Sequence, residues 1–289
     1  MTRSTPPRRR MLALGGALAL AGLLTAGPAL ASFPAKPVTL IVPTAAGGGN
    51  DAMARVLAQK MSQLLGQQVV VDNKAGANGA IASEFVARAA PDGYTLLFGY
   101  IGTHGMNPAL QKLRYDPIAH FEPIGMVCYS PTLMVVNPQV PARTAAEFVQ
   151  LTKAAPDKYN YASAGSGTAP HFAAEMFKIE TGARLTHVPY KGSAPAMTDT
   201  IAGQTQLMFP SLFAAYPYVK GGKLHALAVA GAKRSPLLPQ VPTLEELGIR
   251  SEDHGAVVDP SSPDALGQTV RQELAKWRGV VTKAHLSAD

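Results

Sequence analysis

The amino-acid sequence predicts an α/β protein with a two-lobed, periplasmic-binding-protein-like fold, in which each lobe is a mainly parallel sheet flanked by helices and a ligand cleft lies between the lobes. Predicted strands alternate with predicted helices along most of the chain. Four short loops of small residues each join a strand to a helix, two early and two late. A proline-rich stretch at 233–242 is typical of a crossover between lobes. We therefore expect a signal peptide at 1–31, lobe one at 32–130 and 231–289, and lobe two at 131–230.

The first half of the chain is expected to hold three strands, at 38–42, 68–72 and 94–98. A helix should follow the first strand, with Asn50 as its N-cap and Asp51 in its first turn. A second helix is expected at 81–90. Five apolar residues recur at helical spacing in the first helix and should face the core: Val56, Leu57, Met61, Leu64 and Leu65.

The second half repeats this pattern. Thr144 followed by Glu147 predicts a capped helix start. Ser262-Pro263-Asp264 predicts the start of a last helix, with Leu266, Val270, Leu274, Trp277 and Val281 as its apolar stripe. Strands are expected at 133–136, 159–162, 185–188, 206–209 and 226–229, and further helices at 172–180, 196–202 and 212–219.

The first residues resemble a secretory signal peptide. Arg8-Arg9-Arg10 precedes an apolar run at 11–24 and a small-residue cleavage pattern at 29–31, so cleavage near Ala31 and a periplasmic location are expected. The general and the twin-arginine export routes both remain open. Without four arginines in 1–31, the chain has 26 − 4 = 22 basic and 19 acidic residues, a net charge of +3. This small surplus does not favour a nucleic-acid partner.

Residue types that carry catalysis form no recognisable pattern. The single cysteine, Cys128, lies in an apolar stretch and is expected to be a buried, unreactive thiol. The seven histidines are scattered without metal-ligand spacing, and Gly47-Gly48-Gly49 fits neither a dinucleotide fingerprint nor a P-loop. We therefore expect no cofactor, no metal and no enzymatic activity.

The four small-residue loops, at 44–51, 75–79, 163–168 and 191–195, are the candidate binding site. A glycine-rich turn into a helix exposes backbone N–H groups where the helix dipole is positive, which favours an anion. An ordinary strand–helix turn is the alternative for each loop. Asp51 either accepts a hydrogen bond from the ligand or stabilises the first helical turn. Lys191 either pairs with a second carboxylate or is solvated.

Ordered motifs support a family assignment. Val42-Pro-Thr-Ala-Ala-Gly-Gly-Gly-Asn-Asp51, Asn73-Lys-Ala-Gly-Ala-Asn-Gly79, Pro91-Asp-Gly-Tyr-Thr-Leu96, Ala162-Ser-Ala-Gly-Ser-Gly-Thr168 and Val188-Pro-Tyr-Lys-Gly192 occur in this order. With them the chain resembles the substrate-binding proteins of tripartite tricarboxylate transporters, the Bordetella uptake gene (Bug) receptors. The resemblance implies a periplasmic receptor that closes on a small carboxylate and delivers it to a permease of two integral-membrane subunits.

The resemblance also implies that main-chain groups and ordered waters hold the carboxylate at the first loop, near Thr103 and at the third loop. A monomer is expected. Combined with the loop analysis, it gives these candidate ligand-binding residues: Thr44, Ala46, Gly47, Gly48, Gly49, Asn50, Asp51, Thr103, Ser163, Gly165, Ser166, Gly167, Thr168 and Lys191.

Two departures from the family pattern stand out. Pro210 occupies a position that is commonly aspartate. After Gly248, about one strand–helix unit, on the order of 40 residues, is absent before the last helix. Its loss should expose apolar surface on the strands of lobe one or on the Trp277 helix unless something replaces it. A relative that has lost its transport role, and serves as a sensor or scaffold or has no function, is therefore the alternative to a working receptor.

Overall fold

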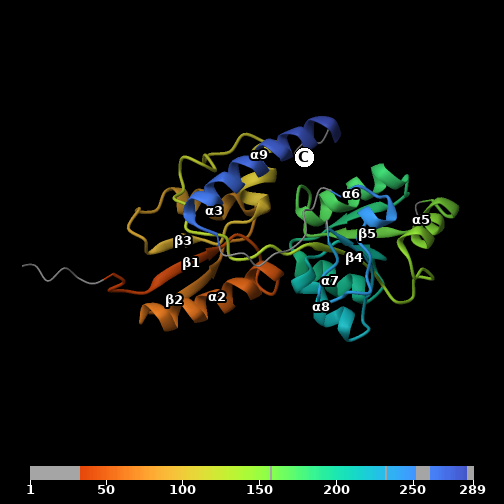
Figure 1. The fold of residues 1–289 in the computed structure, drawn as a ribbon, viewed down its shortest axis with the longest axis horizontal. Helices are drawn as coiled ribbons and strands as arrows, with labels where there is room; N and C mark the ends of the chain where they lie inside the picture. The colour runs from red at the N-terminus through yellow and green to blue at the C-terminus, as the bar shows by residue number, and fades with distance from the viewer. Residues whose placement is uncertain (1–32, 157, 232, 252–260, 285–289) are drawn as a thin grey trace, which may run out of the picture.

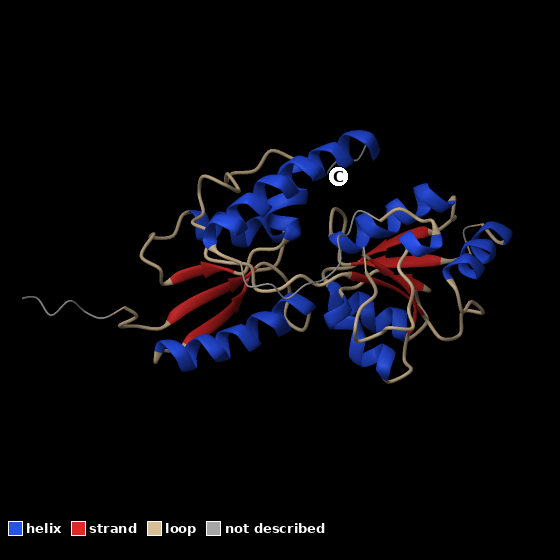
Figure 2. Ribbon diagram, viewed as in Figure 1, coloured by secondary structure: helices blue, strands red, loops and turns tan. Residues whose placement is uncertain are grey.

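The computed structural model describes residues 33–284 except 157, 232 and 252–260. The predicted signal peptide lies outside these residues. Two sheets form two lobes (Figures 1 and 2). No helix in the described part of the chain combines the length and the apolar character needed to cross a membrane.

Lobe one contains a three-stranded parallel sheet in the order β2-β1-β3. Helix α2 covers one face of this sheet, and α3 and α9 lie on the other side (Figure 1). Its elements are β1 (Val38–Val42), α2 (Gly49–Leu65), β2 (Val69–Asn73), the 3-10 helix η1 (Ala77–Gly79), α3 (Ala80–Ala87), β3 (Thr95–Leu97), the π-helix η2 (Gly102–Met106), α4 (Asn107–Leu110) and α9 (Pro263–Ala284).

Lobe two contains a five-stranded sheet in the order β6-β5-β7-β4-β8, with α6 on one side and α7 and α8 on the other (Figure 1). Its elements are β4 (Thr132–Val136), α5 (Ala145–Ala154), β5 (Asn160–Ser163), α6 (Ala169–Thr181), β6 (Thr186–Pro189), α7 (Ser193–Ile201), β7 (Leu207–Met208), α8 (Leu212–Lys220), β8 (His225–Ala230) and the 3-10 helix η3 (Glu245–Leu247).

The α/β class, the two-lobed architecture and the mainly parallel sheets are thus confirmed, with one exception in lobe two, where β4 runs opposite to the other four strands of the sheet. Strand β5 runs parallel to β6 and β7, whereas β4 runs antiparallel to β7 and β8. The direction of β4 follows from where it begins. The chain enters lobe two beside the end of β7, where the Leu133 N–H donates to the Pro210 carbonyl at 2.8 Å. A strand that starts where its neighbour ends must run in the opposite direction.

The segment 233–249 packs on lobe two, which corrects the expectation that 231–289 belongs to lobe one. Leu238, Val241 and Leu244 are buried in the two core clusters of lobe two. The Leu244 N–H also donates to the Val229 carbonyl at 2.9 Å. Apolar burial therefore keeps the proline-rich stretch on lobe two, and the chain returns to lobe one only after Ile249.

Helix α2 differs from expectation in two respects. It begins at Gly49 with Gly48 as N-cap, so Asn50 lies inside its first turn. Val56 and Leu64 are 58% and 86% exposed, although their spacing predicted burial. The other three predicted residues, Leu57, Met61 and Leu65, pack against the core as expected, around the buried small residues Ala54 and Ala58. Alanine carries little hydrophobic signal, yet it lets a helix approach a sheet closely.

The structure shows how far the last helix and the sheet edge of lobe one are buried. Trp277 of α9 is buried, and its ring packs against Phe172 of lobe two, 5.2 Å between ring centroids. On the sheet, β3 pairs only with β1 among the described strands, and all its residues are half-buried. The Trp277 side chain is therefore not the exposed apolar surface that the sequence predicted, and β3 is half-buried at the edge of the described sheet.

Candidate functional site

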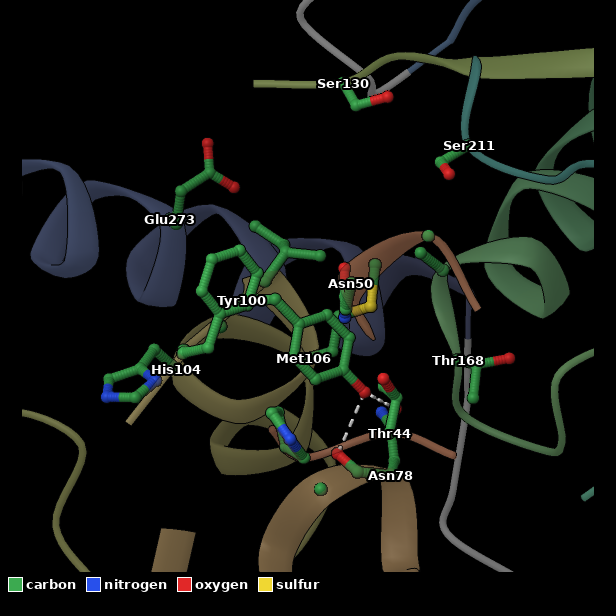
Figure 3. A pocket seen from close by; sticks show the side chains of 18 of the residues that line it. Thr44, Asn50, Asn78, Tyr100, His104, Met106, Ser130, Thr168, Ser211 and Glu273 are labelled. Atoms are coloured by element: carbon green, nitrogen blue, oxygen red, sulfur yellow. Dashed lines mark hydrogen bonds between the residues drawn. The ribbon is translucent and has the colours of Figure 1, made fainter. Parts of the chain in front are cut away.

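A cavity of about 1480 Å³ lies between the lobes, and all four predicted loops reach it. Thr44 comes from the first loop, Asn78 from the second, Thr168 from the third and Lys191 from the fourth. Figure 3 shows side chains of both lobes around this space, with Thr44, Asn50 and Asn78 facing Thr168, Ser130 and Ser211. The loops meet because each joins the carboxyl end of a parallel strand to a helix, and such ends gather at one edge of a sheet.

The helices that follow these loops begin at the cavity and have no side-chain cap. The N-caps of α2, α3, α6 and α7 are Gly48, Gly79, Thr168 and Gly192, and none accepts a side-chain capping hydrogen bond in the described structure. The Thr168 hydroxyl donates to the Gly165 carbonyl at 2.6 Å instead. All four N-cap residues line the cavity.

Three other described helices have side-chain caps, and one of them, α8, also begins at the cavity, where Ser211 Oγ accepts from the Ala214 N–H at 3.4 Å. Thr144 Oγ1 accepts from the Glu147 N–H at 3.1 Å at the start of α5, as the sequence predicted. Ser262 Oγ accepts from the Ala265 N–H at 3.2 Å at the start of α9. Since the first N–H groups of a helix lack intrahelical acceptors, the uncapped starts leave donors at the cavity. Two lobes thus direct helix N-termini at one space, an arrangement that favours an anion.

In the first loop, Thr44 and Asp51 differ in role. Thr44 Oγ1 is buried at the cavity wall and has no hydrogen-bond partner among the described residues, so it is available to a ligand. Asp51 lies behind the loop. Its Oδ2 accepts from the Gly47 N–H at 2.9 Å and from Arg55 Nε at 3.1 Å. Burial raises the pKa of Asp51, but the hydrogen bonds from Arg55 and Gly47 outweigh it, and the pKa is lowered overall. Asp51 therefore remains charged and fastens the loop to α2.

The third loop is held by hydrogen bonds that involve two stacked histidines of lobe two, His171 and His187. Their ring centroids are 4.3 Å apart. His187 Nε2 lies 2.7 Å from the Ser163 hydroxyl, and Ser163 Oγ accepts from the Gly165 N–H at 3.1 Å. His171 Nδ1 accepts from the Gly167 N–H at 3.2 Å. Ser163 is fully buried and supports the loop from behind.

Thr103 likewise supports the site from behind. Its hydroxyl donates to the Tyr100 carbonyl at 2.8 Å and accepts from the Tyr100 N–H at 3.1 Å. His104 Nδ1 lies 2.8 Å from the same oxygen. Burial lowers the pKa of His104 to about 4, so this cavity-lining imidazole is neutral near pH 7.

The structure separates the candidate residues into two groups. Eight line the cavity: Thr44, Gly48, Gly49, Asn50, Gly165, Ser166, Thr168 and Lys191. Six do not: Ala46, Gly47, Asp51, Thr103, Ser163 and Gly167. Of the six, Gly47, Asp51, Thr103, Ser163 and Gly167 make hydrogen bonds that hold the lining loops in place.

Several polar lining residues were missed by the sequence reasoning, among them Asn78, His104, Ser130, Ser211 and Glu273. Asn78 lies in a predicted loop and was detectable as a polar side chain among small ones. Ser130, Ser211 and Glu273 come from the first crossover, the start of α8 and the last helix. No local pattern connects these three positions.

This fold and site define a two-lobed binding protein with its ligand cleft between the lobes. The tripartite tricarboxylate transporter family receptor model matches residues 53–280, and the chain belongs to this family. BugT of Bordetella pertussis is 36% identical over 244 residues, which are 83% of this chain and 74% of BugT.

Solved structures agree. The periplasmic binding protein BugD superposes with a TM-score of 0.82 at 32% identity, covering 89% of this chain and all of BugD. Rpa4515 of R. palustris, solved with adipate, gives a TM-score of 0.83 at 30% identity, covering 88% of this chain and 99% of Rpa4515.

Proposed function

We propose that this chain is an exported solute receptor that binds a small carboxylate between its lobes and delivers it to the membrane subunits of a tripartite tricarboxylate-type transporter. The observation that carries the proposal is the convergence of four uncapped helix N-termini, from both lobes, on one cavity. All four add positive potential for an anion, and α2, α6 and α7 also offer backbone N–H donors, whereas the first N–H of α3, that of Ala80, already donates to the Ala77 carbonyl. The neighbouring structure with adipate supports the ligand class.

The buried Thr44 hydroxyl supports the same ligand chemistry. A buried hydroxyl without a partner is unfavourable unless a ligand or water completes it. A carboxylate at the start of α2 would accept from this hydroxyl and from the N–H groups near Gly49. Lys191 on the opposite lobe would contribute a positive charge. We assign the ligand contacts to the eight lining residues named above and a supporting role to Asp51, Thr103, Ser163 and Gly167.

The transport role and the location rest on the family and on the amino terminus. The family is that of transporter receptors, and the similar BugD is a periplasmic binding protein. The signal-like segment at 1–31 supports export of this chain by the same kind of route. A receptor of this kind works by lobe closure, and the closed form is what a permease would recognise.

Ligand-dependent stabilisation tests the proposal. The chain lacking residues 1–31 should be melted alone and with mono-, di- and tricarboxylates, aromatic acids and acidic amino acids. A ligand at 100 to 1,000 times its Kd should raise the free energy of unfolding by about 3–4 kcal/mol. The Thr44→Val variant, which keeps the side-chain shape but lacks the hydroxyl, should respond less to the same compound.

A cooperative melt that no compound in a broad panel shifts would argue against a carboxylate receptor. Mass spectrometry of the bound compound provides a second check, because a receptor returns its ligand unchanged. Conversion of the compound would show that the site is catalytic.

A further inference from the structure

A hydrogen bond crosses the cleft between the second loop of lobe one and the third loop of lobe two. Asn78 Nδ2 donates to the Gly167 carbonyl at 2.7 Å. Asn78 lines the cavity, and Gly167 lies between the lining residues Ser166 and Thr168. The contact therefore joins the two lobes at the wall of the proposed ligand site.

The Asn78 side chain is held firmly by its own lobe. Asn78 has a left-handed backbone, with φ 48° and ψ 39°. Asn107 Nδ2 donates to the Asn78 carbonyl at 2.9 Å, and Asn107 Oδ1 accepts from Asn78 Nδ2 at 3.1 Å. The Tyr100 hydroxyl donates to the Asn78 carbonyl at 3.1 Å and also contacts its Oδ1 (Figure 3). One hydrogen of the Asn78 side-chain amide is thus donated to Asn107 Oδ1, and the other is donated to the Gly167 carbonyl of lobe two.

The Gly167 peptide is equally constrained on its own lobe. Its φ is +75°, and its N–H donates to His171 Nδ1. With the N–H held by lobe two and the carbonyl held by Asn78, the orientation of this loop depends on both lobes. When the lobes separate, the Gly167 carbonyl loses this partner and the loop keeps only its hydrogen bonds within lobe two.

We propose that Asn78 is an interlobe positioning residue that fastens the closed state and orders the third loop around the ligand. The inference rests on the proposed receptor function, because the loop that Asn78 orders is part of the ligand site. Asn78 holds the Gly167 carbonyl at lobe one. When the lobes open, this hydrogen bond breaks and the third loop loses its fixed orientation. Its main effect should be on the rate of ligand release.

The chemistry of asparagine suits this role. Asparagine tolerates the left-handed conformation and offers two donors and an acceptor on one rigid group. The Asn78→Asp variant keeps the shape and the acceptor for Tyr100, but it places a carboxylate oxygen against the Gly167 carbonyl. The Asn78→Gly variant tolerates the same backbone and removes the side chain. Tyr100→Phe is the matched control, because it weakens support of Asn78 within lobe one and leaves the crossing donor in place.

The lobe separation can be measured without ligand. Spin labels at Val56→Cys on α2 and Ile179→Cys on α6 sit at positions that are each 58% exposed, in a Cys128→Ser background. Asn78→Asp and Asn78→Gly should shift the distance distribution toward longer distances, while Tyr100→Phe should shift it less. Unchanged distributions in both Asn78 variants would overturn the proposal.

Release of adipate, the compound present in the similar Rpa4515 structure, gives the second readout. Loss of one hydrogen bond should speed release about 3- to 10-fold, with Asn78→Asp above Asn78→Gly. Equal release rates in wild type and both variants would also overturn it. If the wild-type protein binds no carboxylate, the proposed function is wrong. The spin-label distances measured without ligand still decide whether Asn78 holds the two lobes together.

Discussion

The rings of Phe172 and Trp277 pack edge to face where the two lobes meet. Their centroids are 5.2 Å apart, with 66° between the ring planes. Phe172 belongs to α6 of lobe two, and Trp277 belongs to the last helix of lobe one. Met106 and Val280 complete this buried cluster. The cluster lies near the Asn78–Gly167 hydrogen bond, since Leu110 packs against the cluster and its Cδ1 would lie 3.4 Å from a Cβ added at Gly167. The last helix therefore holds the lobes together through apolar burial.

Trp277→Ala should open the lobes and destabilise the protein. Truncating a buried tryptophan typically costs about 3–5 kcal/mol, and an interface between lobes that can part gives a value near the lower end. Urea unfolding measures the stability, and small-angle scattering measures the opening as a larger radius of gyration. Gln272→Ala, on an exposed position of the same helix, is the control. Compact Trp277→Ala protein with wild-type stability would show that the cluster does not hold the lobes.

Gly49 allows the first loop to approach lobe two closely. A Cβ at Gly49 would lie 2.6 Å from Ser211 Oγ, whereas a Cβ at Gly48 would come no closer than 3.5 Å to the Ala45 carbonyl oxygen. Gly49→Ala should therefore displace the Ser211 hydroxyl, which caps α8, and weaken carboxylate binding by on the order of tenfold, through an overpacking cost of about 1–3 kcal/mol. Gly48→Ala should lower the affinity less, as calorimetry can measure. The reverse order would place the steric limit at Gly48.

His104 should make the stability depend on pH. Burial lowers its pKa to about 4 in the folded protein, whereas the unfolded chain binds a proton near pH 6.5. Between pH 6.5 and 4 the unfolded state binds more protons, so stability falls as the pH falls, by up to about 3 kcal/mol. His104→Gln, which cannot titrate, should flatten this part of the profile in denaturant unfolding. An unchanged slope would assign the acid sensitivity to other groups.

Much of the fold could be predicted from the sequence because its signals are local. The apolar run before Pro43 predicted β1, and the Thr144–Glu147 pair predicted the start of α5. The opposite direction of β4 in lobe two was missed, since strand direction depends on where the chain enters the lobe. The exposed Val56 and Leu64 were missed because Ala54 and Ala58 carry little hydrophobic signal yet form the buried face.

The site was predictable where it is made of backbone and less so where it is made of side chains. Glycines before helices indicated all four loops that line the cavity. Thr44 lines the cavity, whereas Ser163 supports the third loop from the protein interior. The direction of each side chain decides between these roles, and a glycine-rich sequence does not reveal that direction. Ser130, Ser211 and Glu273 reach the cavity from elements whose position depends on the packing of the whole chain.

Gly48→Asp gives the sharpest test of the uncapped helix starts, because it should change stability and binding in opposite directions. Gly48 occupies the N-cap of α2 with φ −84° and ψ 172°, a conformation open to aspartate. An aspartate there can accept from the first N–H groups of the helix, so the free energy of unfolding should rise by a few tenths of a kcal/mol. The carboxylate of the introduced aspartate would itself occupy the anion site, so the affinity for carboxylate ligands should fall at least about 100-fold.

Thr144→Ala is the matched control. It removes a helix cap far from the cavity, should lower the free energy of unfolding by about 1 kcal/mol and should leave binding unchanged. Chemical unfolding and calorimetry measure both quantities, and full binding by Gly48→Asp would show that the start of α2 does not hold the ligand carboxylate.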